Sequence, residues 1–169
     1  MSQELVTYIV LGSVNRLKNL KLPKSDIDSE YLRANLKDDE PFEKTLDKVI
    51  TISKGRIIVL LPPSSFPTAN AKKLLRKISM IDLSAWGWFD IKEKNNLLNN
   101  LKKISTIVRS IPHLEQGIYF NKRLYFSVGG IGKFNNNYFN EIAKRLYSRI
   151  DPQNPLPALI IRTKNLDLF

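Results

Sequence analysis

The side chains of this 169-residue chain that are best suited to a chemical task are clustered cations. Lys and Arg number 27 against 16 Asp and Glu, which gives a net charge of +11. The excess is uneven: residues 62–169 hold 17 basic and 7 acidic residues, whereas residues 1–61 hold 10 and 9. Clustered cations attract polyanions by releasing counterions, so nucleic acid or a nucleotide phosphate is the first ligand class to consider.

Short stretches of the chain concentrate these cations. Four basic residues fall within six positions with no acid between them: Lys72, Lys73, Arg76 and Lys77. Farther along the chain, another basic pair and an isolated lysine flank a glycine-rich stretch: Lys122, Arg123 and Lys133. Two interpretations stay open. Such residues can contact phosphates, or they can form a solvated lysine face of the kind that keeps many proteins in solution.

Other kinds of chemistry have little support in the sequence. The chain has no cysteine, which excludes disulfides, thiolate catalysis and cysteine-ligated zinc or iron–sulfur centres. Its single histidine, His113, has no nucleophile motif to serve, and no phosphate loop, dinucleotide fingerprint or metal-ligand cluster is present. We therefore expect no cofactor, no metal and no catalytic activity of the chain alone, and an enzyme is the weakest of three interpretations.

The cations of residues 72–77 are expected on a helix. Thr68 can cap it, and four apolar residues fall on one side while the basic residues cover the other: Ala71, Leu74, Leu75 and Ile78. A second helix is predicted from Asn135 to Ile150, with a buried stripe formed by Tyr138, Phe139, Ile142, Ala143, Leu146 and Ile150. Glycines 129, 130 and 132 would turn the chain sharply before it.

Helices are also predicted elsewhere. The segment from Ile91 to Arg109 is expected to bury five aliphatic residues: Leu97, Leu98, Leu101, Ile104 and Val108. Weaker helical patterns cover residues 3–20 and 25–35. Lys48–Ile52 and Arg56–Leu61 are β-branched runs around a Gly-containing turn, and this predicts a hairpin. Trp86 and Trp88 can either pack in the core or stack on bases, and core packing is the more common role.

These elements predict a mainly α protein, a helical bundle with a small β-hairpin. Residues 1–25 are interpreted as a possibly flexible N-terminal arm, and residues 26–169 as a single helical domain. No apolar run approaches the roughly 20 residues that cross a bilayer, so we expect a cytoplasmic protein without membrane contact.

Several short motifs, taken in order, resemble a known family. Phe66-Pro67 opens the basic helix, His113-Leu114 precedes Gly117 and the Lys122-Arg123 pair, and Gly130-Ile131-Gly132 precedes the next helix. This order is similar to the C-terminal helical domain of the archaeal and eukaryotic primase large subunit, and the resemblance covers residues 66–169. That domain holds an iron–sulfur cluster through four cysteines, which this chain lacks. The resemblance therefore points to a cluster-free relative, such as the third, non-catalytic subunit of the crenarchaeal DNA primase.

The resemblance implies a role in primer synthesis. A non-catalytic primase subunit would hold the 5′-triphosphate of the initiating nucleotide and the single-stranded DNA template, while the catalytic small subunit and the large subunit act as partners. Any divalent metal would belong to the catalytic partner. The residues carried over are His113, Lys122, Arg123 and Lys133 for the triphosphate, with Lys72, Lys73 and Arg76 as a ridge for template or triphosphate. A common site requires Lys72, Arg76 and Arg123 to share a hollow.

A plainer hypothesis competes with this one. The chain could be an adaptor that binds single-stranded DNA or RNA through its basic face, without preference for a particular nucleotide. The two hypotheses differ in whether a 5′-triphosphate strengthens binding.

Overall fold

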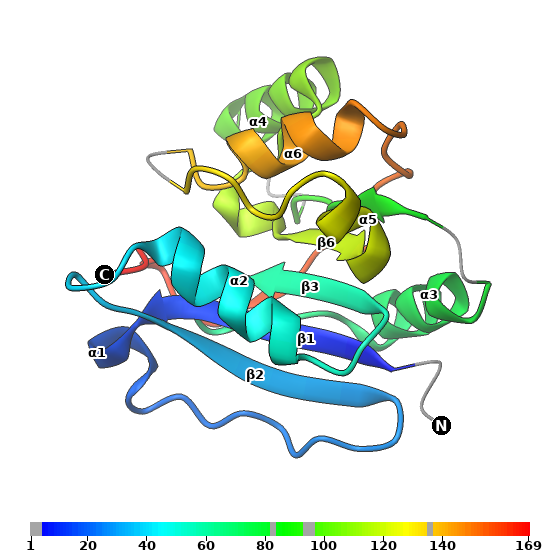
Figure 1. The fold of residues 1–169 in the computed structure, drawn as a ribbon. Coiled ribbons are helices and arrows are strands. Elements are labelled where there is room, and N and C mark those ends of the chain that lie inside the picture. The colour runs from blue at the N-terminus through cyan, green and yellow to red at the C-terminus, as the bar shows by residue number, and fades with distance from the viewer. Residues whose placement is uncertain (1–4, 82–83, 93–96, 135–136) are drawn as a thin grey trace.

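A computed structural model describes residues 5–81, 84–92, 97–134 and 137–169. Its centre is a five-stranded mixed sheet in the order β2-β1-β3-β6-β5. Strands β1 (Val6–Ser13), β2 (Ser29–Leu36) and β3 (Ile57–Leu61) are parallel, and β6 (Ile118–Asn121) and β5 (Trp86–Gly87) are added antiparallel. The predicted helical bundle is therefore wrong, and the protein is a mixed α/β fold (Figure 1).

Strand β1 explains much of this error. Its residues from Val6 to Leu11 are at most 1% exposed, because the strand is covered on both faces. A strand buried on both faces is a nearly continuous apolar run and lacks the alternation that identifies a half-buried strand. The helix predicted over residues 3–20 is thus wrong over residues 6–13, and only residues 14–17 of it are helical. Part of the predicted N-terminal arm lies inside the sheet.

Two further helix and strand predictions are reversed. Residues 29–35, expected in a helix, belong to β2, which has an alternating pattern of burial. Residues 48–52, expected as the first strand of a hairpin, belong to helix α2 (Phe42–Ile52), while the second predicted strand is confirmed as β3. Strand β3 pairs with β1 and β6 instead of with a hairpin neighbour. Leu46 and Ile50, one helical turn apart on α2, are both buried against the sheet, and this tertiary packing overrides the local β propensity of residues 48–52.

The parallel strands are doubly wound. The connection from β1 to β2 includes α1 (Val14–Leu17) and packs Leu17 on the face of Val6, Tyr8 and Val10. Helix α2 connects β2 to β3 over the opposite face, where Leu46 and Ile50 belong to the same cluster as Ile9 and Leu11. The connection from β1 to β2 moves across the sheet in one direction, and the connection from β2 to β3 moves back in the other. Connections between parallel strands are right-handed, so these two must lie on opposite faces of the sheet.

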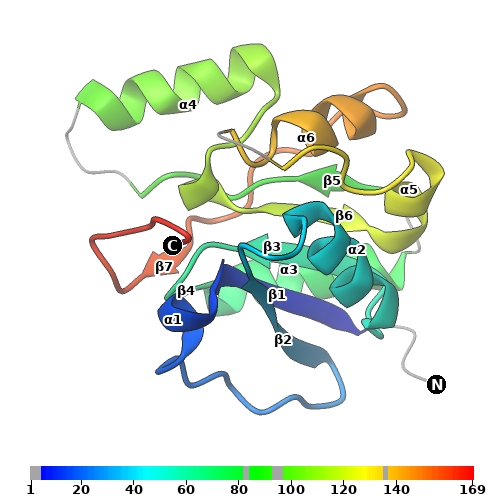
Figure 2. The ribbon, with the colours of Figure 1, turned by 60° about the vertical axis from the view of Figure 1, so that its left-hand side comes forward.

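The remaining helices divide between these layers. Helix α3 (Ala69–Met80), capped by Thr68 as predicted, packs Ala71 and Leu75 on the Tyr8 face. Helices α5 (Lys122–Ser127) and α6 (Asn140–Tyr147) pack on the other face. Helix α6 is shorter than the predicted helix and buries Ile142, Ala143 and Leu146 of the predicted stripe. Phe139 is buried just before it, and Tyr138 and Ile150 are partly buried outside it. Helix α4 (Leu97–Arg109) lies at the periphery in both ribbon views (Figures 1 and 2).

Short elements complete the fold. A 3-10 turn, η1 (Leu114–Gln116), leads into β6, and a two-stranded sheet pairs β4 (Ser65–Phe66) with β7 (Ile160–Ile161) near the C-terminus. Trp86 and Trp88 are 0% and 4% exposed and meet edge to face in the core, so the core interpretation is the correct one. Of the helices that the structure describes, none combines the length and the apolar character needed to cross a bilayer.

Candidate functional site

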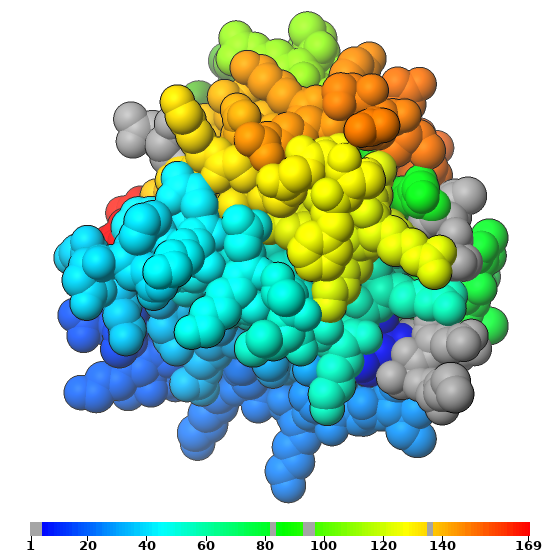
Figure 3. Space-filling view, viewed as in Figure 1, coloured from blue at the N-terminus to red at the C-terminus, as the bar shows by residue number. Residues whose placement is uncertain are grey.

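One end of the sheet carries a hollow that is lined by several cations. Because β6 runs antiparallel to β3, Asn121 at the end of β6 lies opposite Ile57 at the start of β3. Residues 54–56 and 121–123 therefore meet, and the Lys122 amide donates to the Arg56 carbonyl over 2.7 Å. They line a hollow of about 290 Å³, which we call the α5 hollow, with Lys54, Gly55, Arg56, Asn121, Lys122, Arg123 and Phe126. Figure 3 shows the yellow side chains around α5 directly against the cyan and green residues that end α2 and approach β3.

Four of these lining residues are cations and none is acidic. The charge comes from side chains and not from the start of α5. The Asn121 side-chain oxygen already accepts the amides of Arg123 and Leu124, at 2.9 and 3.3 Å. The first free amides of the helix are thus partly satisfied by its cap.

Lys122 is held in place by the end of a neighbouring helix. Its ammonium donates to the carbonyl oxygens of Thr51 and Ser53, at 3.1 and 2.5 Å. These carbonyls belong to the C-terminal end of α2, where the helix dipole favours a cation. Burial lowers the pKa of the Lys122 ammonium, and the charge of Glu30 works in the opposite direction. An ammonium has three N–H donors, and two of those of Lys122 go to these carbonyls. The third can donate to a ligand in the hollow.

Glu30 is the acidic residue to weigh against these cations. It accepts hydrogen bonds from the Thr7 hydroxyl at 2.7 Å and from the Lys54 amide at 2.8 Å. Both bonds go to its Oε2, and Glu30 is not among the residues that line the hollow. Among the described lining residues the cations therefore predominate, which suits a phosphate group.

Gly55 lets two backbone segments approach beneath the hollow. Its amide donates to the Thr7 hydroxyl at 2.9 Å, and a Cβ at this position would lie 2.6 Å from the Thr7 amide nitrogen. A Cβ atom cannot approach backbone so closely, so a glycine is needed here. The glycine thereby sets the positions of Lys54 and Arg56 on either side.

An aromatic ring borders the cations. Phe126 is 49% exposed and lines the hollow, and its ring meets that of Tyr125 edge to face at 5.4 Å. Tyr125 is fully buried and stacks on Phe120 at 5.1 Å, so Phe126 stands on a rigid base. A fixed, exposed ring beside cations is the arrangement that binds unstacked bases in single-stranded nucleic acid.

The predicted ridge on α3 lies on the other face of the sheet. The Lys72 ammonium donates to the Tyr31 hydroxyl at 2.8 Å and lies 5.5 Å from the centre of that ring. The Arg76 guanidinium pairs with Asp28 at 3.3 Å, whereas Lys73 is exposed. None of the three hollows described in this section is lined by residues of both α3 and α5. Of the seven predicted site residues, the structure thus joins only Lys122 and Arg123 in the α5 hollow.

His113 lies in a separate hollow of about 320 Å³, with Lys102, Leu114, Glu115, Asn137, Tyr138 and Leu166. Burial and the nearby charge of Lys102 lower the pKa of its imidazole, so the ring is neutral at pH 7. Its backbone amide donates to the Gln116 side-chain oxygen at 2.9 Å, which fixes the η1 turn. Lys133 is exposed in the loop after Gly132. Neither residue lines the α5 hollow.

A second basic hollow occupies the opposite end of the sheet, and we call it the strand-end hollow. It measures about 380 Å³ and is lined by Arg16, Asn19, Leu20, Lys21, Ser64, Phe66 and Arg162. It lies beyond the C-terminal ends of β1 and β3, the position at which doubly wound sheets often bind ligands. Its Arg16 guanidinium, however, already donates to the backbone carbonyls of Asn165 and Asp167. Arg16 therefore ties down the C-terminal segment.

The sequence analysis missed Lys54 and Arg56. Both flank Gly55 in what looked like a hairpin turn, where cations are expected to be solvated. Recognising them required the pairing of β3 with β6, which are about 60 residues apart in the chain. Local periodicity carries no information about such a pairing.

Comparisons with known proteins assign no family. No family model matches the chain, and no curated protein matches it either. Within the described parts of the chain, no three His, Asp or Glu side chains gather as candidate metal ligands.

Proposed function

We propose that this protein binds single-stranded nucleic acid in the α5 hollow. The observation that carries the proposal is the lining itself: its described residues include four cations and no acid, and an exposed ring stands on a rigid base. Lys54, Arg56 and Arg123 would neutralise successive phosphates, and Phe126 would stack on a base between them. Stacking needs a base whose face is open, so a single strand fits this surface better than a duplex.

The proposal matches the general adaptor hypothesis of the sequence analysis. The narrower hypothesis, a non-catalytic primase subunit, stays a prediction that depends on short sequence motifs, and the helical fold that the resemblance implied is not the fold of the chain. In the narrower version, a 5′-triphosphate would occupy the α5 hollow with Lys122 and Arg123. It would not span all seven predicted residues, since α3 lies on the other face of the sheet.

The first experiment removes two charges from the hollow. Lys54→Gln with Arg123→Gln should weaken binding of a fluorescent single-stranded oligonucleotide about tenfold, measured by anisotropy. The slope of log K against log salt should fall by roughly 1.4, because each lost phosphate contact removes about 0.7.

Its control removes the same charge at the other end of the sheet. Lys21→Gln with Arg162→Gln changes net charge equally and belongs to the strand-end hollow. The control should bind within about twofold of the unmodified protein. An equal loss in both double variants would show that only net charge matters, and a larger loss in the control would move the site to the strand-end hollow.

The second experiment tests the ring. Phe126→Leu should weaken binding of the oligonucleotide by about 1–3 kcal/mol, while Phe126→Tyr keeps the ring and should stay near the unmodified protein. A duplex of the same sequence should respond little to Phe126→Leu. Equal responses of single strand and duplex would contradict stacking.

A third titration separates the two hypotheses. Oligonucleotides with and without a 5′-triphosphate are compared on the same protein. The adaptor hypothesis predicts no preference for the 5′-triphosphate, on the unmodified protein and on the Lys21/Arg162 control alike. A preference of tenfold or more that disappears in Lys54→Gln with Arg123→Gln would favour the primase hypothesis.

A further inference from the structure

Helix α4 exposes an apolar face that none of the described segments covers. Six aliphatic side chains on this helix are more than half exposed: Leu97 at 75%, Leu98 at 63%, Leu101 at 54%, Ile104 at 58%, Ile107 at 68% and Val108 at 77%. Within α4 only Thr106 is buried. The predicted burial of this face within the chain is therefore wrong. Contiguous apolar surface of this kind marks an interaction site in a folded protein.

The spacing of these residues is that of a coiled-coil seam. Leu97, Leu101, Ile104 and Val108 follow one another at intervals of four, three and four, which places them at alternating d and a positions of a heptad. Leu98 and Ile107 widen the seam on its two sides. Thirteen residues span about 20 Å, so the seam offers nearly two heptads.

Charge is kept away from this seam. The positions flanking it are Leu98 and Ser105 on one side, and Asn100 and Ile107 on the other, all uncharged. The Lys102 ammonium pairs with Glu115 at 2.7 Å, and the Lys103 ammonium pairs with Asp90 at 3.3 Å, so both lysines are directed at their own chain. In coiled coils, charges at the flanking positions select the partner helix. Because these positions are uncharged in α4, they neither repel an identical helix nor favour an acidic one.

We propose that α4 pairs with α4 of a second copy of this chain. The seams of two identical helices are complementary to each other about a two-fold axis. The uncharged flanking positions let the two helices come close together. A helix pair of this length is smaller than a standard interface, so the dimer is weak and forms at micromolar or higher concentration. Two molecules of net charge +11 also repel each other at long range. Salt screens that repulsion, so added salt should strengthen the dimer.

The salt dependence distinguishes this interface from nucleic-acid binding. Binding of a polyanion weakens as salt rises, whereas an apolar seam between two cationic molecules strengthens. A dimer joined through α4 would also carry two α5 hollows. If the proposed function holds, one long strand could engage both hollows with a gain in avidity.

The test is the oligomeric state of the full chain by sedimentation velocity. The protein is examined from about 1 to about 200 µM, in roughly 50 mM and roughly 500 mM NaCl. We expect a concentration-dependent monomer–dimer equilibrium whose dissociation constant falls severalfold at the higher salt. A monomer throughout both series would overturn the proposal.

Matched variants place the interface. Leu101→Glu with Ile104→Glu should leave only monomer, with circular dichroism confirming that the fold is kept. Ile27→Glu with Met80→Glu makes the same charge change at two exposed apolar residues elsewhere, at 85% and 55% exposure, and should leave the dimer intact. A dimer that survives the α4 change, or that the control abolishes, would assign the contact to another surface.

Crosslinking gives an independent readout. The chain has no cysteine, so Leu101→Cys and Ile104→Cys introduce unique thiols. Mild oxidation should give intermolecular disulfides in one of these variants or in their mixture, faster than in Met80→Cys. Equal rates in the α4 and Met80 variants would contradict pairing through α4.

Discussion

Helices α4 and α6 have similar sequence patterns and opposite surroundings. Both are amphipathic, and both were predicted to bury an apolar stripe. In α6 the residues Ile142, Ala143 and Leu146 are 0% exposed and pack against the sheet. In α4 the equivalent face is open. An amphipathic pattern therefore predicts that a helix has a face to bury, but not that its own chain provides the cover.

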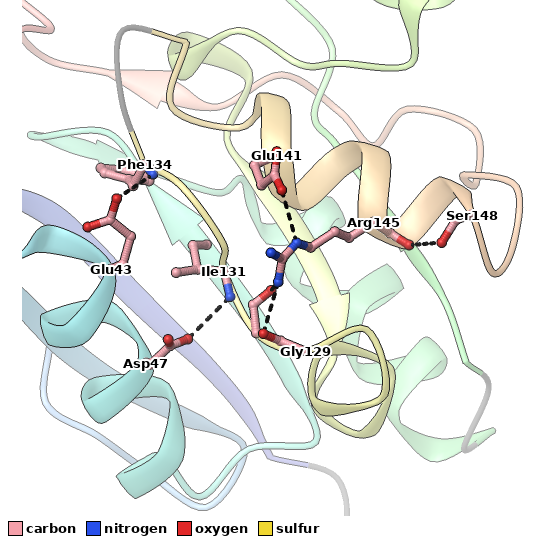
Figure 4. A network of polar contacts seen from close by, with 9 residues as sticks. Glu43, Asp47, Gly129, Ile131, Phe134, Glu141, Arg145 and Ser148 are labelled. Carbon is pink, nitrogen blue, oxygen red and sulfur yellow. Dashed lines mark hydrogen bonds and ion pairs between the residues drawn. The ribbon is translucent and has the colours of Figure 1, made fainter.

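Polar contacts hold α6 and the turn before it to the sheet layer. The Asp47 carboxylate on α2 accepts the Ile131 amide at 3.2 Å and the Tyr125 hydroxyl, and Glu43 accepts the Phe134 amide at 2.9 Å. Figure 4 shows how Arg145 on α6 reaches back to the Gly129 carbonyl, at 2.9 Å, and to Glu141, at 3.3 Å. Side chains of α2 and α6 thus form hydrogen bonds with the backbone of the glycine-rich turn from both sides.

The contacts that hold α4 differ in kind. The lysine pairs with Glu115 and Asp90 are partly solvated. A buried contact joins the Thr106 hydroxyl to the Gln116 side-chain oxygen at 2.7 Å. Surface ion pairs stabilise little, so the buried contact should contribute more than these two pairs, whereas α6 has a packed stripe.

The largest expected difference comes from the stripes themselves. Leu146→Ala should lower the free energy of unfolding by about 2–5 kcal/mol, because a fully buried leucine leaves a cavity. Leu101→Ala on α4 should change it by less than about 0.5 kcal/mol in dilute protein, where the proposed dimer is absent. Denaturant unfolding measures both. Similar losses for the two variants would contradict the comparison.

The turn before α6 should be next in sensitivity. Gly132 has φ of 69°, and a Cβ there would lie 2.3 Å from the Glu141 Cγ. Gly132→Ala should therefore cost about 2–3 kcal/mol of unfolding free energy. Gly129→Ala shares the left-handed backbone at φ of 87° but meets only the Arg145 Nη1 at 3.4 Å, so it should cost about 1 kcal/mol. Equal destabilisation of the two variants would show that the contact of the added Cβ with α6 does not contribute to the loss of stability at Gly132.

The buried contact of α4 predicts a smaller effect. Thr106→Val keeps the shape of the side chain and removes its hydroxyl, so the unfolding free energy should fall by about 1 kcal/mol. Ser105→Ala, at the adjacent position on α4, should be close to neutral. Thermal unfolding followed by circular dichroism would compare them, and a neutral Thr106→Val would mean that the hydroxyl does not hold α4.

The smallest effect concerns pH and the Asp47 carboxyl beneath the turn. Burial raises the pKa of this carboxyl above its ordinary value of 3.8, against the opposing effects of the Ile131 amide and Arg145. The folded state then binds the proton more tightly than the unfolded state. From pH 3.8 up to the raised pKa, this group makes stability fall as pH rises.

Asp47→Asn isolates that contribution, because an amide oxygen can still accept from the Ile131 amide. The unmodified protein should lose stability relative to the variant as pH rises from about 3.5 to 7, since effects of other carboxyls cancel in the difference. Unfolding free energies of both proteins across that range test it. A difference that is constant, or that changes in the opposite direction, would contradict the assignment.

The sequence predicted those features that depend on neighbours in the chain. Thr68 capped α3 as expected, the stripe of α6 was found by its spacing, and the glycines at 129, 130 and 132 all have positive φ. Caps, helical stripes and left-handed glycines are set within a few residues, so a local pattern contains the information. The clustering of Lys122 with Arg123 was visible for the same reason.

Tertiary structure alone decided which segments are strands, and where the cations meet. Residues 6–11 read as a weak helix because a strand covered on both faces has no alternation, and only its pairing with β2 and β3 reveals it. Lys54 and Arg56 join Lys122 and Arg123 through the pairing of β3 with β6, while Lys72 and Arg76 go to the opposite face. Contacts between distant segments decide on which face of the sheet a residue lies. The charge of residues and their spacing along the chain do not contain this information.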